Sequence, residues 1–422
     1  MNMPAAPNEK KRISTLISLI IAGETVFFLP FVMARIFRPT LLSVFDITNT
    51  ELGIFFSAYG VVAMISYIFG GTLADLYPAR SLMAIALWLT SLGGFVMTFV
   101  PPSGVMIALY AFWGFTSIFL FWAAMIRATR EWGGQGFQGR AFGWLEGGRG
   151  ATAAILGTFS FFLFSGLMPE SPNVPIAGNG IHAFQYVILS VSGFTFLTGF
   201  LIWRFVPASQ AISIRQPVNE TLQKIFRLLR MPTIWMLTII IVCAYVGYKI
   251  TDDFSLYAKE VLGFSEVGAA GIGTIALWIR AIVAISAGIL ADRFNKVKVI
   301  ILCFALTIGS GLLTGFGILD HITGLILLNL TITATGIYGV RALYFAILDE
   351  AEIPFAYTGT AVGIVSFVGF TPEVFMSPWM GHLLDKHPGA TGHQYVFIVL
   401  SLFALIGLLA SLLFSKTSKK SN

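Results

Sequence analysis

Residues 288–298 read Gly-Ile-Leu-Ala-Asp-Arg-Phe-Asn-Lys-Val-Lys, and residues 71–80 read Gly-Thr-Leu-Ala-Asp-Leu-Tyr-Pro-Ala-Arg. Both stretches share Gly-x-Leu-Ala-Asp followed by basic residues. Each joins the end of one long apolar segment to the start of the next, and the two lie about half the chain apart. In a membrane protein, a motif that recurs at such a distance indicates two halves built on one plan.

The composition is that of a protein solvated by lipid. Of the 422 residues, 56% are hydrophobic and 11% are charged, whereas a soluble protein carries roughly 25% charged residues. The basic start, residues 1–12, and the uncleavable apolar run after it predict no removable signal peptide. Cys243 and Cys303 lie in apolar segments and are predicted to be buried hydrophobic side chains, so we expect no disulfide, metal site or cofactor.

The apolar segments predict twelve membrane-spanning helices, because about 20 apolar residues cross a hydrocarbon core of about 30 Å. The predicted spans are 13–37, 52–74, 81–100, 104–127, 141–167, 182–204, 233–253, 264–288, 298–318, 321–346, 356–382 and 393–414. An even number of spans puts both termini on one side. Most of the 26 lysines and arginines flank the loops of that side, which predicts cytoplasmic termini. This asymmetry accounts for the net charge of +6 without a nucleic-acid partner.

The repeated motif resembles the signature loop of the major facilitator superfamily, with departures at Leu76 and Pro78 in the first copy. Residues 139–150, Gly-Arg-Ala-Phe-Gly-Trp-Leu-Glu-Gly-Gly-Arg-Gly, resemble the YihN-like branch of that superfamily. The resemblance implies an all-α membrane protein with twelve transmembrane helices in two pseudo-symmetric six-helix bundles. The expected divisions are 1–204, a cytoplasmic linker at 205–232, and 233–422. We expect a monomer in the bacterial inner membrane.

The resemblance also implies a cytoplasmic gate. In the family, the motif's aspartate pairs with neighbouring helix ends, where a helix N-terminus and a guanidinium both favour a carboxylate. Asp75 would face the start of span 356–382 and Arg127 or Arg130. Asp292 would do the same with span 141–167 and the end of span 321–346. Ordinary tight turns are the alternative. The expected gate residues are Gly71, Asp75, Arg80, Arg127, Arg130, Gly288, Asp292 and Arg293.

Charged residues inside predicted spans are candidate functional residues, because each costs about 2.5–3.5 kcal/mol on insertion scales. Glu146 and Arg149 share a helix face at i, i+3 and could form a structural ion pair. Lys249, Asp252 and Asp253 are expected to form a solvated helix end instead. The candidates for substrate binding or proton coupling are Glu24, Glu146, Arg149, Arg280, Arg341 and Glu373, together with the polar residues Tyr245, Tyr248, Asn329 and Tyr338.

These features predict a secondary active transporter that moves a small polar solute by alternating access. The buried arginines favour an anionic or zwitterionic solute, and a glutamate at membrane depth can carry a proton, since desolvation disfavours its ionised form. The chain has no phosphate-binding Gly-x-x-x-x-Gly-Lys-Ser/Thr loop, so we expect that ATP does not drive transport directly. It shows no nucleophile–base set or metal cluster, so we expect no enzyme activity. An exporter of amphipathic compounds and a non-transporting membrane sensor are the alternatives.

Overall fold

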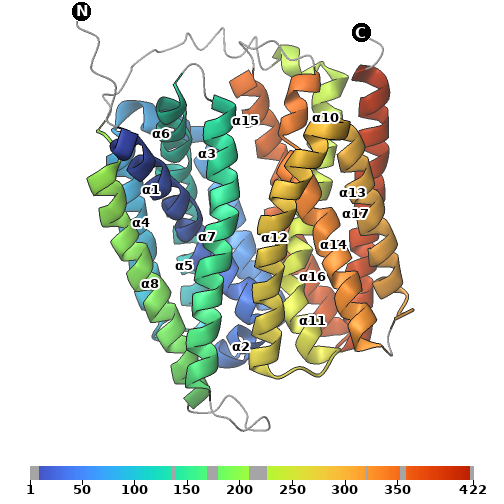
Figure 1. Ribbon diagram of the computed structural model, residues 1–422. Coiled ribbons are helices and arrows are strands. Elements are labelled where there is room, and N and C mark those ends of the chain that lie inside the picture. The colour runs from blue at the N-terminus through green and yellow to red at the C-terminus, as the bar shows by residue number, and fades with distance from the viewer. Residues whose placement is uncertain are drawn as a thin grey trace, which may run out of the picture. The chain divides into compact units, whose positions relative to one another are not determined.

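The computed structural model describes residues 9–134, 138–168, 179–208, 226–319, 322–351 and 358–418. These residues form helices joined by short turns, with no strand among them. Twelve helical stretches are long and apolar enough to cross a membrane. The predicted all-α fold with twelve transmembrane helices is therefore confirmed (Figure 1).

By its internal contacts the chain divides into two compact units. Unit 1 comprises Met1–Ala34 and Ala58–Ser213, and unit 2 comprises Arg35–Ser57 and Ile214–Asn422. Unit 2 thus includes a segment, residues 35–57, that the sequence places in the first bundle. The predicted divisions 1–204, 205–232 and 233–422 stay a prediction, and residues 209–225 of the linker lie outside the described residues.

In unit 1, α4 packs against α8, and α1 packs against both α7 and α8 (Figure 1). Leu19, Met83, Leu87 and Phe121 are fully buried in the apolar core between these helices. The helices that belong to this unit, wholly or for most of their length, are α1 (Glu9–Phe27), η1 (Phe28–Val32), α3 (Asn49–Leu76), α4 (Ala79–Met97), α5 (Ser103–Gly114), η2 (Phe115–Trp122), α6 (Ala123–Gly133), α7 (Gln138–Leu167) and α8 (Asn179–Phe205).

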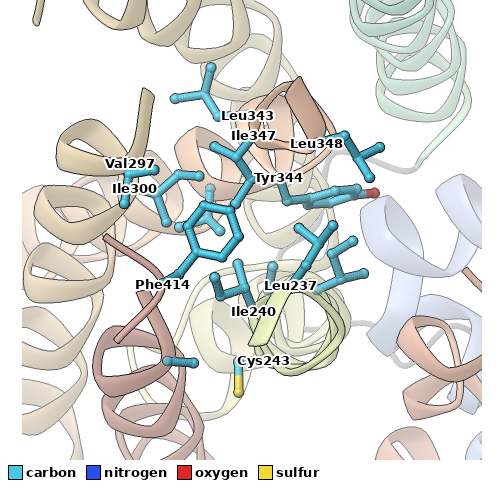
Figure 2. Packing of buried hydrophobic residues seen from close by; sticks show 14 of the residues in the cluster. Leu237, Ile240, Cys243, Val297, Ile300, Leu343, Tyr344, Ile347, Leu348 and Phe414 are labelled. Atoms are coloured by element: carbon cyan, nitrogen blue, oxygen red, sulfur yellow. The ribbon is translucent and has the colours of Figure 1, made fainter. Parts of the chain in front are cut away.

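In unit 2, α13 packs against α14 and α17, and α10 also packs against α17. Figure 2 shows the core at one end of these helices, where Leu237, Ile300 and Phe414 are fully buried. The helices of this unit are α2 (Met33–Phe45), α10 (Pro232–Ile250), η3 (Thr251–Asp253), α11 (Phe254–Glu260), α12 (Glu266–Phe294), α13 (Lys296–Gly315), α14 (Thr323–Leu343), η4 (Ala346–Ala351), α15 (Thr358–Gly369), α16 (Pro372–Lys386) and α17 (Ala390–Ser418).

Several spans are interrupted, and the breaks position charged residues. The first span changes from α-helix to the π-helix η1 and then bends at Phe37, just before Pro39, as π-bulges and prolines commonly cause. The seventh span is broken by the 3₁₀ turn η3. The eleventh span stops at the end of α15 and restarts at Pro372, the first residue of α16.

The repeated motif is more helical than the sequence predicts. We predicted spans ending at residues 74 and 288, but α3 continues to Leu76 and α12 to Phe294. The turn after α12 is a single residue, Asn295, whose φ is +105°. Its side chain accepts a hydrogen bond from the Lys298 backbone N–H at 3.2 Å and so starts α13. Asparagine tolerates positive φ and caps helices well, which explains why the loop can be this short.

Candidate functional site

A group of buried charges lies where α2, α10, η3 and α16 meet in unit 2. We call Arg35, Lys249, Asp252 and Glu373 the α10–α16 ion cluster. All four side chains are between 0 and 6% exposed. Buried charges of this kind are stable only when they are paired and hydrogen-bonded, so the pairing of each one matters.

Glu373 connects α16 to α10. It lies in the first turn of α16, directly after Pro372, where the helix N-terminus favours a carboxylate. The Lys249 ammonium lies 3.0 Å from its Oε1, and the Tyr245 hydroxyl donates to its Oε2 at 2.6 Å. A break in one span therefore presents a carboxylate to two residues of α10.

Asp252 is the second carboxylate of the cluster. Its Oδ1 lies 2.6 Å from Nη2 of Arg35, and its Oδ2 lies 3.1 Å from Nζ of Lys249. The prediction that Lys249, Asp252 and Asp253 form a solvated helix end was wrong, since all three are buried. The reason is that the seventh span continues to Glu260 and is covered by the 35–57 segment.

Arg341 on α14 has aromatic rather than acidic neighbours. Its guanidinium carbon lies 3.6 Å from the centroid of the Tyr248 ring and 5.9 Å from that of Tyr245. Its Nη1 is buried without a hydrogen-bond partner, and no carboxylate among the described residues forms an ion pair with it. Arg280, another candidate from the sequence, is a buried residue of α12.

A second group of charges, in unit 1, joins α1 to α7, and we call Glu24, Glu146 and Arg149 the α1–α7 ion cluster. Nε of Arg149 lies 3.4 Å from Oε2 of Glu24 and donates to the Gly23 carbonyl at 3.0 Å. Its Nη1 donates to Glu146 at 2.6 Å. Glu24 is buried, whereas the Glu146 side chain is 58% exposed. One guanidinium therefore serves two carboxylates.

The gate residues of the first half lie at the ends of α3 and α6. Arg127 donates to the Ala74 carbonyl at 2.5 Å and to Glu131 at 2.8 Å. Arg80 stacks over Trp203 with its guanidinium carbon 4.7 Å from the ring centroid. The side chain of Asp75 lies outside the described residues. Gly71 has open space around it, and Arg130 is exposed.

In the second half, Asp292 and Arg293 are exposed at the end of α12, and Gly288 again has open space around it. Asp292 makes no hydrogen bond or ion pair with the part of the chain that the structure describes. Span 141–167 is an expected partner of Asp292, and the side chain of Arg140 beside that span lies outside the described residues. The gate role of all these residues stays a prediction.

The remaining pocket candidates have different surroundings. Asn329 uses both amide hydrogens in packing α14 against α13, because it donates to the Ser310 carbonyl and to Oγ1 of Thr314, each at 2.8 Å. Tyr338 is buried with its ring edge-on to Tyr248. Tyr338 therefore borders the α10–α16 ion cluster, while Asn329 faces another helix.

Sequence reasoning missed Arg35, Lys249 and Asp252 as members of a site. A signal was available: Lys249, Asp252 and Asp253 recur at i, i+3 and i+4, the spacing of neighbours on one helix face. The sequence also offered no reason to single out His393, which is fully buried. Its Nδ1 lies 2.7 Å from Asp253, and its Nε2 lies 3.3 Å from Glu260. Among the described residues no group of acidic, histidine or cysteine side chains has the geometry to hold a metal.

Comparison with known proteins gives a family match over most of the chain. Residues 14–371 match the model of the Major Facilitator Superfamily. The inner membrane protein YqcE of Escherichia coli is 30% identical over 424 residues, covering 97% of this chain and 96% of YqcE. The inner membrane protein YihN of the same organism is 25% identical over 416 residues, with 96% of each chain covered.

Solved structures show the same fold at low sequence identity. A bacterial homolog of the human lysosomal transporter Spinster, crystallised in an inward-facing and unoccupied conformation, matches with a TM-score of 0.76 and 14% identity over 98% of each chain. The nucleoside transporter NupG matches with a TM-score of 0.66 and 15% identity, over 96% of this chain and 98% of that one.

Proposed function

Because the chain belongs to the Major Facilitator Superfamily, we propose that it is a secondary active transporter that moves a small anionic or zwitterionic solute by alternating access. Its relatives are named inner membrane proteins, which supports the same location, with both termini in the cytoplasm. The twelve spans and the lysine and arginine asymmetry of the loops support this orientation.

The observation that carries the anionic substrate is Arg341. A guanidinium is always charged and is strongly stabilised by bidentate pairing with a carboxylate or phosphate. Arg341 lies in the last turn of α14, and no carboxylate among the described residues forms an ion pair with it. The three cations Arg35, Lys249 and Arg341 and the two carboxylates Asp252 and Glu373 lie around Tyr245 and Tyr248, so these five groups together carry a net positive charge. A bound anion would neutralise it.

The tyrosines around Arg341 suit a solute with an apolar part beside its charge. Tyr248 is held in place by Arg35, whose Nη1 donates to its hydroxyl at 2.9 Å, and Tyr245 is held by Glu373. Both rings are therefore held in place. Aromatic side chains that are already held in place favour binding, because they lose little conformational entropy when the solute binds.

A thermal-shift screen of the purified protein tests this proposal, because a ligand that binds only the folded state raises apparent stability. We expect anionic metabolites to stabilise the wild type and Arg341→Gln to lose that effect. The variant without ligand should have a stability close to that of the wild type, since no carboxylate among the described residues forms an ion pair with Arg341. Arg204→Gln, an exposed cation at the end of α8, is the matched control and should keep the ligand effect.

Two outcomes would contradict the proposal. If Arg341→Gln lowers the stability of the ligand-free protein but leaves anion stabilisation intact, Arg341 has a structural role. If only neutral amphipathic compounds stabilise the protein, and do so equally in the variant, export of amphipathic compounds becomes the better function, with Tyr245 and Tyr248 as an apolar surface.

A further inference from the structure

The end of α16 carries a third copy of the repeated motif. Residues 381–386 read Gly-His-Leu-Leu-Asp-Lys, which keeps the Gly-x-Leu-x-Asp spacing and the following basic residue. As in α3 and α12, the aspartate lies within the last residues of its helix, since α16 ends at Lys386, one residue after Asp385. Spans two and eight run in one direction through the membrane and span eleven runs in the other. The third copy therefore lies on the membrane face opposite to the first two.

Asp385 caps the start of α3. Its Oδ1 accepts from the Asn49 backbone N–H at 3.0 Å, and its Oδ2 accepts from the Thr50 backbone N–H at 2.7 Å and from the Thr50 hydroxyl at 2.6 Å. Thr48 and Glu51 form a capping box that satisfies the next backbone N–H. The first backbone donors of α3, which have no partner within the helix, thus depend on a carboxylate from α16.

Glycines let α3 and α16 approach at this contact. A Cβ added to Gly381 would lie 2.3 Å from the Asn49 carbonyl oxygen and 2.7 Å from the Thr50 Cα. One added to Gly53 would lie 2.5 Å from the Ser377 carbonyl oxygen. These atoms all belong to the backbone, so neither side can yield to a larger residue. The glycine of the third motif copy therefore makes room for the helix end that its aspartate caps.

Polar contacts also hold other parts of the 35–57 segment, beside buried apolar side chains such as Phe37 and Leu41. Arg35 pairs with Asp252, its carbonyl accepts from the Ser255 hydroxyl at 3.0 Å, and Thr40 donates to Glu266 at 2.7 Å. Along the chain, this segment is continuous with α1 and with the rest of α3, which belong to unit 1. Hydrogen bonds and capping contacts can be replaced by water when they separate, so such an attachment is suited to reversible release.

We propose that residues 381–386 are an outer-face counterpart of the two repeated loops, and that Asp385 is a latch. It holds the 35–57 segment on unit 2 in one state of the transport cycle and releases it in the other. Asp292, in the second copy on the opposite face, is exposed while Asp385 is engaged. We therefore expect Asp385 to cap a helix in one state of the transport cycle and the aspartate of a motif copy on the opposite face to cap a helix in the other state.

Ser377 is a reporter for release of the latch. It is 1% exposed beneath Gly53, and its hydroxyl has no hydrogen-bond partner among the described residues, so Ser377→Cys changes little. The native Cys243 and Cys303 are buried. Labelling of the protein without the Ser377→Cys substitution measures the background from these two cysteines. In intact cells, a membrane-impermeant maleimide should label this cysteine slowly, at the rate at which the segment releases.

Two variants should accelerate the labelling for independent reasons. Asp385→Ala removes both accepting oxygens of the cap, and we expect about 2- to 30-fold faster labelling, the range that loss of a helix cap produces. Gly381→Val separates the helices by steric contact and should act at least as strongly. The matched controls are Asp46→Asn and Gly363→Val, which should not change the rate. Asp46 is an exposed carboxylate in the turn before α3, and Gly363 has open space around it in the same span as Gly381.

Unchanged labelling in both variants would overturn the latch and make the contact a static part of the fold. If either variant fails to fold, a disulfide between Thr50→Cys and Asp385→Cys replaces it. That cross-link should lower Ser377→Cys labelling at least tenfold and reduction should restore it, whereas equal rates before and after reduction also overturn the proposal. The inference rests on the alternating-access part of the proposed function. Because it is tested without substrate, it can fail while anion binding stands.

Discussion

At the scale of single residues, Lys249 and Glu373 determine the character of the α10–α16 ion cluster. Both charged side chains are almost completely buried, and the Lys249 ammonium lies 3.0 Å from the Glu373 carboxylate. Desolvation opposes such a pair as strongly as attraction favours it, so the pair adds little net stability, whereas removing one partner leaves a buried charge. The cluster is therefore better understood as a specific arrangement of charges than as a source of stability.

A double-mutant cycle tests this view. Glu373→Gln and Lys249→Met should each lower the free energy of unfolding by about 2–4 kcal/mol, because each leaves the other charge with one partner fewer. The double variant should lose clearly less than the sum, with a coupling of about 1–3 kcal/mol. Chemical unfolding in detergent measures all three. Glu131→Gln, whose partner Arg127 is more exposed, should change stability by less than about 1 kcal/mol. Additive losses at Lys249 and Glu373 would contradict the pairing.

The sequence predicts part of this site and misses another part for a physical reason. Depth within a hydropathic span identified Glu373, Arg341 and the two tyrosines, because a charge or hydroxyl at depth needs a partner or a function. Lys249 and Asp252 lie near the end of the predicted span 233–253, where hydropathy cannot distinguish exposure to water from burial under another chain segment. The covering group is Arg35, distant along the chain, so only the fold reveals the pairing.

At the scale of elements, the twelve spans follow from composition but their interruptions do not. Hydropathy measures average apolarity and is unchanged by the π-helix η1 or by the turn η3. Pro30, Pro39 and Pro372 were visible in the sequence, yet a proline in a membrane helix can be accommodated without a break. The breaks matter because Asp252 and Glu373 lie within or just after one. Discontinuous helices are where transporters commonly place ligand and ion sites.

Close helix packing supports these broken spans, and Gly336 shows how. A Cβ at this position of α14 would lie 2.3 Å from the Thr307 hydroxyl and 2.7 Å from the Cys303 carbonyl oxygen on α13. Gly336→Ala should therefore lower the free energy of unfolding by about 1–3 kcal/mol, the usual effect of overpacking. Gly324→Ala, on the same helix with nothing within 4 Å, is the control and should be neutral or slightly stabilising, since alanine favours the helix. Equal thermal stability of the two variants would show that α13 and α14 can separate freely.

At the scale of the whole molecule, the α1–α7 ion cluster and the α10–α16 ion cluster together with Arg341 differ in the sign of their net charge. The α1–α7 ion cluster has two carboxylates for one guanidinium, whereas Arg35, Lys249 and Arg341 outnumber Asp252 and Glu373. One unit can therefore lower its electrostatic energy by taking up a proton, and the other by binding an anion. Coupled movement of a proton and an anion would keep both clusters close to neutral during the cycle.

Glu24 is the carboxylate expected to carry that proton, because it is buried while Glu146 is exposed to water. In proteoliposomes, a gradient of one pH unit supplies about 1.4 kcal/mol per proton, enough for about tenfold accumulation of a co-transported solute. With the anion identified by the thermal-shift screen, the wild type should reach that accumulation. Glu24→Gln should still exchange the anion across the membrane but no longer concentrate it, and Glu146→Gln should behave like the wild type. Tenfold accumulation by Glu24→Gln would move the coupling site elsewhere, and Glu373 would then be the next carboxylate to replace.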